Sequence, residues 1–143
     1  MKNKGIGFNF LGVKTEQFAL LDENFNKKKE VSLGSDLEFK LNCKNKQLGI
    51  FATFRFEQTK TAFLKLQISC HFQVVSESWV DYCNDKEIVF PKDFMAHLSM
   101  LTVGTARGVL HAKTEGTGFN RFMLPLINVA DLVKSDVVFN LSE

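Results

Sequence analysis

The chain has 143 residues, of which 45% are hydrophobic and 24% charged, and its formal net charge is +2. This length predicts one domain over residues 1–143 with a core of its own, and so small a charge gives no argument for nucleic acid as a partner. The sequence contains 15 phenylalanines against one tryptophan and one tyrosine. Because that is more large apolar surface than a small monomer readily buries, it indicates subunit interfaces or an exposed apolar binding surface.

The sequence shows no sign of secretion or of membrane insertion. Its first residues, MKNKGIGFNF, lack the apolar core of a signal peptide, and no apolar run approaches the roughly 18 residues of a membrane-spanning helix. We therefore expect a cytoplasmic protein. Cys43, Cys70 and Cys83 have neither the spacing of a disulfide framework nor that of a zinc site, so we expect free thiols.

Four strands are predicted before any helix. Residues 5–20 predict an irregular strand, because the apolar alternation slips by one residue around Gly12, as it does at a β-bulge. Apolar and polar residues then alternate strictly over 37–43, 50–56 and 64–74, which is typical of strands with one covered face. Short polar connections between them favour antiparallel hairpins. The sequence therefore predicts a four-stranded antiparallel meander.

The apolar phase also suggests a register for two of the hairpins. If the apolar faces are kept together and the polar connections form the turns, Glu38 lies opposite Arg55, a favourable pair of charges. The same reasoning places Phe54 beside Leu64 in the next hairpin.

A long helix is predicted from Pro91 to about Lys113, since proline suits the first helical position. Within it, small residues recur at four-residue spacing as Gly104, Gly108 and Ala112. Two glycines inside a helix cost roughly 1 kcal/mol each relative to alanine. Close packing of the helix on the sheet, or a helix–helix contact between subunits, could offset that cost, and the sequence leaves both open.

After the helix comes a polar loop, then extended backbone before Pro125, and then a short C-terminal helix that Asn128 caps and that ends near Ser135. The overall prediction is an α+β fold in which one long helix and a short C-terminal helix cover the sheet.

Aromatic residues and methionine occur in two irregular segments beside the predicted helix. Irregular segments often carry binding residues, and these side chains suit adaptable apolar contacts. The alternative is that each simply fills the core. The residues predicted to bind a peptide are Trp79, Tyr82, Phe119, Phe122 and Met123.

Catalytic groups do not form a coherent site. His97 and His111 are about 21 Å apart along the helix axis, too far to share a metal. Neighbours in a strand point to opposite faces, so Cys70 and His71 cannot act as nucleophile and base. We therefore expect no enzymatic activity, no cofactor and no metal.

The order of these elements resembles that of the SecB family of export chaperones. The likeness of layout covers nearly the whole chain, while the sequence motifs lie in about 45 residues. The residues that carry it are Ile88, Phe90, Pro91, Arg107, Gly108, Leu124, Pro125, Ile127, Asn128 and Leu132. The resemblance implies a homotetramer that binds unfolded polypeptides without ATP, in apolar grooves beside its helices. In the family such clients are preproteins held for export, or an antitoxin in relatives associated with toxin–antitoxin systems.

One departure from the family bears on partners. Export chaperones of the family use an acidic sheet face and a C-terminal tail to reach the motor protein SecA. Here the outward strand positions are nearly balanced, carrying Asp36, Glu38 and Glu57 against Lys40, Lys44, Arg55 and Lys65. This weakens the case for SecA and raises that for a dedicated client.

Two other classes compete with a chaperone. One is a structural or assembly subunit whose apolar surface is wholly buried by its own oligomer. The other is a hotdog-type thioesterase, which is less favoured because its helix precedes most of its strands. The helix here also has only one acid, Asp93, at its start.

Overall fold

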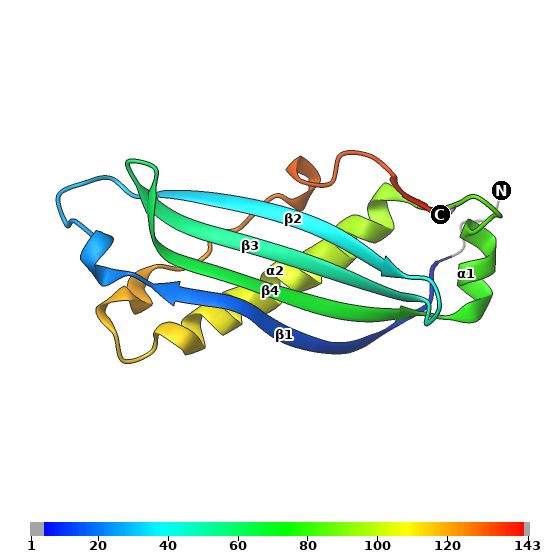
Figure 1. Ribbon diagram of the computed structural model, residues 1–143, viewed down its shortest axis with the longest axis horizontal. Helices are drawn as coiled ribbons and strands as arrows, with labels where there is room; N and C mark the ends of the chain where they lie inside the picture. Colours follow the sequence, from blue (N-terminus) through cyan, green and yellow to red (C-terminus); the bar gives the residue numbers. More distant parts are fainter. Residues whose placement is uncertain (1–4, 142–143) are drawn as a thin grey trace.

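The computed structural model describes residues 5–141 and shows a long, twisted antiparallel sheet with helix α2 (Lys92–Thr114) lying across one face (Figure 1). Its strands are β1 (Phe8–Leu20), β2 (Ser32–Asn42), β3 (Gln47–Gln58) and β4 (Thr61–Val74). A shorter helix, α1 (Ser76–Tyr82), and a two-stranded sheet of β5 (Glu87–Phe90) and β6 (Val137–Asn140) stand at one end. The predicted α+β class and the four-stranded antiparallel sheet are confirmed.

The predicted four-stranded meander is wrong in one respect: the strand order is β1-β4-β3-β2, so only β2, β3 and β4 form a meander, and β1 pairs with β4 and not with β2. Pairing with β1 satisfies the edge of β4, a 14-residue strand that would otherwise expose its backbone groups. β1 has a bulge between Phe10 and Gly12, where the sequence predicts one, and a second between Thr15 and Gln17.

The predicted register of β2 and β3 is wrong. Glu38 lies opposite Phe51, and Arg55 lies opposite Gly34. The reason is the turn, which takes only residues 43–46 and is closed by Lys46 in a left-handed conformation, with φ 57°. A shift by an even number of residues leaves every side chain on its predicted face, so the apolar pattern could not detect the error.

The register of β3 and β4 also differs, since Phe54 pairs with Leu66 and not with Leu64. The chain turns in two residues, Thr59 and Lys60, both with positive φ (51° and 66°). Next to this turn, β4 has a β-bulge, which places one residue more in β4 than in the facing part of β3. As a result Phe63 and Leu64 are both buried, at 0% and 1% exposed.

The main core lies between the sheet and α2. Pro91 precedes the helix as its N-cap, close to the predicted start. The face turned to the sheet buries Met95, Leu98, Val103, Ala106 and Leu110. Full burial of a large apolar side chain contributes about 1.5–3 kcal/mol, so this stripe holds the helix on the sheet.

The connections at the end of the sheet differ most from expectation. The predicted C-terminal helix is a single 3-10 turn, Val129–Asp131, although Asn128 does cap it by accepting a hydrogen bond from Ala130 N at 3.2 Å. Helices this short are marginal, and the β-prone residues that follow pair with β5 instead. Cys43, Cys70 and Cys83 are free thiols, as predicted. Over residues 5–141, no helix has the length and hydropathy needed to span a bilayer.

Candidate functional site

The predicted peptide-binding residues lie at opposite ends of α2. Trp79 and Tyr82 belong to α1 beside the start of α2, whereas Phe119, Phe122 and Met123 follow its end (Figure 1). A helix of 23 residues is about 34 Å long. A polypeptide that touches both groups would therefore span about ten extended residues along the helix.

Trp79 fills the core, being only 7% exposed, with its ring centroid 6.3 Å from that of Phe90. Tyr82 is half-buried and packs on the same phenylalanine, also at 6.3 Å. Both rings therefore attach α1 to β5, and Tyr82 is the one that reaches the surface.

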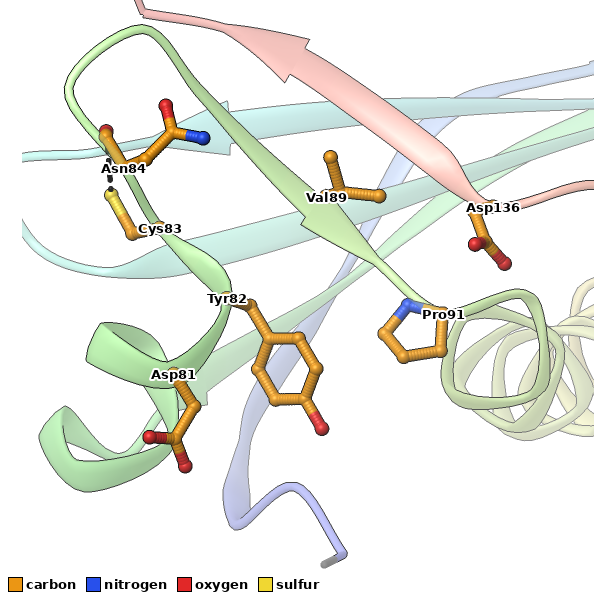
Figure 2. A pocket seen from close by; sticks show the side chains of 7 residues that line it. All are labelled: Asp81, Tyr82, Cys83, Asn84, Val89, Pro91 and Asp136. Atoms are coloured by element: carbon orange, nitrogen blue, oxygen red, sulfur yellow. Dashed lines mark hydrogen bonds between the residues drawn. The ribbon is translucent and has the colours of Figure 1, made fainter. Parts of the chain in front are cut away.

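Tyr82 borders a surface hollow of about 440 Å³ between α1, β5 and the residue before β6 (Figure 2). Asp81, Cys83, Val89, Pro91 and Asp136 also line it. Asp136 Oδ1 accepts a hydrogen bond from Lys92 N at 2.8 Å, which ties the start of β6 to the first turn of α2. Over the described residues, no group of three or more His, Cys, Asp and Glu side chains is placed to hold a metal ion.

Further hollows flank the first turns of α2. One of about 370 Å³ shares Tyr82 and Pro91 with the hollow above and is otherwise lined by Gly5, Ile6, Phe8, Asp93, Phe94 and His97. Another of about 290 Å³ is lined by Lys92, Asp93, Ala96, Ala130, Val133 and Lys134. Depressions therefore flank the N-terminal half of α2, and their volumes are near the lower end of those that bind small molecules.

An aromatic cluster closes the other end of the core. Phe25 folds back from the loop after β1, and its ring centroid is 4.9 Å from Phe63 and 5.3 Å from Phe119. Phe122 is 5.2 Å from Phe63, and Arg121 lies over the Phe122 ring at 4.9 Å. Phe119 and Phe122 are half-buried, so they serve the core while keeping one edge at the surface.

From this cluster onward, residues 122–128 have no regular secondary structure and are held by Arg107. Its Nε donates to the Leu124 carbonyl oxygen at 3.0 Å, and its Nη2 donates to that of Pro125 at 2.8 Å. Leu124 is buried, but Met123 is 60% and Leu126 is 96% exposed. The backbone is therefore anchored while two large apolar side chains face water.

Sequence reasoning identified Met123 but missed Leu126. The sequence feature that could have revealed Leu126 is Pro125. Proline has a fixed φ and favours extended backbone before it, so the side chains on either side of it cannot all face the core.

The small-residue stripe of α2 faces away from the sheet. Gly104, Gly108 and Ala112 are exposed, and Met100, one turn earlier, is 56% exposed. A Cβ placed on Gly104 or Gly108 would meet no atom of another segment of the chain within 4 Å. Packing of these glycines on the sheet, one of the two alternatives, is therefore wrong, and a contact between subunits stays a prediction.

The fold is SecB-like. The structure is similar to that of Rv1957 of Mycobacterium tuberculosis, a SecB-like chaperone in complex with a ChAD peptide from the Rv1956 HigA1 antitoxin. The TM-score is 0.50, with 7% sequence identity over 85% of this chain and 91% of that one. At this identity the likeness shows the fold alone.

A second similar structure is a protein of unknown function from Streptococcus agalactiae. It has a TM-score of 0.39 and 13% identity, covering 87% of this chain and 100% of that one, which is too weak to support an inference. No protein-family model matches the sequence, and no curated protein matches it.

Proposed function

We propose that this protein is a SecB-like molecular chaperone, a holdase that binds unfolded polypeptides without ATP in the cytoplasm. The SecB-like fold supports the proposal, and so does the polypeptide bound in the structure of Rv1957. The client is either a preprotein kept unfolded for export or a dedicated partner such as an antitoxin. The balanced charges of the outer sheet face argue against docking to SecA and so favour a dedicated client.

The observation that carries the proposal is the exposure of large apolar side chains along α2. In the segment beside the helix, Met123 and Leu126 are 60% and 96% exposed. Burying such a side chain against a client contributes up to about 1.5–3 kcal/mol, and the effect does not depend on direction, so many sequences can supply it. Methionine adapts its shape to different partners, which suits a surface that binds unfolded chains.

The proposed client path runs along α2. It begins at Tyr82, which borders two of the hollows, and ends at Phe119, Phe122 and Met123, with Leu126 added to the predicted set. Trp79 lies beneath the path, where its fluorescence would report changes in the packing of α1.

We also propose that the subunits associate, as a homotetramer, through the outer face of α2. Within one chain, no other segment lies within 4 Å of where a Cβ on Gly104 or Gly108 would stand, so close packing against these glycines does not offset their helical cost of roughly 1 kcal/mol each there. A second helix could approach closely where side chains are small. Gly108→Leu should then lower the mass measured by light scattering, while Lys113→Leu, exposed on another side of the helix, should leave it unchanged. A monomeric wild-type protein would contradict the tetramer.

Suppression of aggregation tests client binding. A reduced, unfolded model client is diluted with the wild-type protein in the absence of nucleotide, and light scattering is followed. We expect suppression by the wild type and a weaker effect of the Met123→Ser/Leu126→Ser variant. The matched control is Val31→Ser, a 39% exposed apolar residue in the loop before β2.

The test also separates the competing classes. If the wild type neither suppresses aggregation nor binds an apolar dye as an intact oligomer, a structural subunit is the better interpretation. Hydrolysis of an acyl thioester by the purified protein would instead favour the thioesterase.

A further inference from the structure

The sheet face opposite α2 contains a hollow of about 310 Å³ near the turn between β2 and β3. Two positive side chains from opposite edges of the sheet line it, Lys14 on β1 and Lys40 on β2. Over residues 5–141, neither lysine forms an ion pair, and no carboxylate lines the hollow. Lys40 Nζ instead lies 4.5 Å from the centroid of the Phe51 ring.

His71, which lines the hollow, has glycine as its cross-strand neighbour on both sides. Gly12 pairs with it from β1 and Gly49 pairs with it from β3. A Cβ on Gly49 would lie 3.0 Å from Phe51 Cε1 and 3.5 Å from His71 Nδ1. The rings of Phe51 and His71 therefore lie close over Gly49, with His71 Nδ1 on that side, which is possible because glycine has no side chain, and all three residues line the hollow.

A chain of hydrogen bonds determines which nitrogen of neutral His71 carries the proton. The Ser69 hydroxyl donates to Glu16 Oε2 at 2.7 Å, so its single proton is used. The 2.9 Å contact between Ser69 Oγ and His71 Nε2 must then have the histidine as donor. Nδ1 of the neutral ring therefore offers a lone pair to the hollow, and protonation of the ring turns it into a donor.

We propose that this hollow is a docking site for an acidic segment of a partner polypeptide, whose carboxylates bind Lys14, Lys40 and protonated His71. The site lies on the opposite side of the sheet from α2, so it is separate from the proposed client path. Asn42 and Gln47 at its rim provide amides that can bond an extended backbone.

Charge favours a polypeptide over a nucleic acid as the occupant. The adjoining turn adds Lys44 and Lys46 at the same end of the sheet, which suits a short acidic stretch. The whole chain has a net charge of only +2, however, and a nucleic acid is bound mainly by many cationic contacts to phosphate.

The docking depends on pH through His71. Burial and the nearby Lys14 lower the pKa of His71, and Glu16 opposes this. Lys40 approaches from β2, whereas β3 contributes only uncharged residues to the hollow. A bound carboxylate favours the charged ring and raises this pKa, so binding takes up a proton. Affinity should therefore increase as the pH falls from about 7.5 to about 6, where the carboxylates of the segment are still ionised.

The probe is a fluorescein-labelled octaglutamate peptide, titrated with the full-length protein and followed by anisotropy at an ionic strength of about 0.05 M. Lys14→Gln/Lys40→Gln should weaken binding at least about tenfold. The control Lys65→Gln/Lys113→Gln removes the same charge away from the hollow and should weaken it less than about twofold. His71→Asn should keep the affinity at pH 7.5 within about twofold but lose the gain at pH 6.

Three results would overturn the proposal. Equal weakening by both lysine pairs would show a general effect of charge and no site. Equal weakening by Met123→Ser/Leu126→Ser would place the acidic peptide on the client path. Binding of a single-stranded oligonucleotide of the same length about tenfold more tightly than octaglutamate would assign the hollow to nucleic acid.

Discussion

Replacing Arg107 with methionine tests how the segment that exposes Met123 and Leu126 is held. Methionine keeps much of the aliphatic stem but cannot donate to the carbonyl oxygens of Leu124 and Pro125, which the guanidinium contacts at 3.0 and 2.8 Å. The substitution therefore removes two hydrogen bonds while largely preserving the packing beside α2.

The expected loss follows from the environment of the two bonds. A hydrogen bond from a charged donor contributes about 1.5–3 kcal/mol, and exposure to water reduces this. The bond to Leu124 is partly buried and the bond to Pro125 is exposed. We therefore expect a fall of about 2 kcal/mol in the free energy of unfolding, which corresponds to about 4–8 °C in Tm for a chain of this size.

Urea denaturation at fixed protein concentration measures the loss, and hydrogen exchange of the Leu126 and Ile127 amides reports local release of the segment. Lys113→Met is the control, since this residue is exposed on the same helix. Arg107→Lys should fall between wild type and Arg107→Met, because an ammonium cannot reproduce the two-pronged contact. A change below about 0.5 kcal/mol, with unaltered exchange, would refute the anchoring role.

Three further predictions concern stability and reactivity. Gln58 is 4% exposed and makes three hydrogen bonds to the backbone of the loop before β2, so Gln58→Leu should cost about 2 kcal/mol and speed tryptic cleavage of that loop; unchanged cleavage would contradict this. Thr59→Asn/Lys60→Gly should raise the free energy of unfolding in urea by about 1 kcal/mol, because both positions have positive φ, and a loss would show that the turn is unstrained. Burial raises the pKa of Cys70, which lowers its thiolate fraction at neutral pH. Mass spectrometry after alkylation should therefore find exposed Cys43 modified and Cys70 protected until the protein unfolds, and equal rates would contradict the burial.

The residues of the proposed client path could be predicted only in part. Aromatic composition pointed to Tyr82, Phe119 and Phe122, but their separation by the length of α2 depends on contacts between distant segments. Trp79 shows the same limit of prediction from sequence, because a large aromatic side chain is suited both to binding a client and to filling a core. The hollow at His71 was not predicted, since Lys14 lines it only because β1 pairs with β4.

The sequence by itself determined the features that depend on neighbours in the chain. Alternation with period two assigned the strand faces, Gly12 marked a bulge, and Pro91 marked the start of the long helix. Only the tertiary structure decided the register, the place of β1 and the outward position of Gly104 and Gly108. Sliding two strands by an even number of residues preserves both faces, and a favourable cross-strand charge pair contributes only about 0.2–1 kcal/mol. Turn geometry and long-range pairing outweigh that energy, and neither is encoded in the period of the apolar residues.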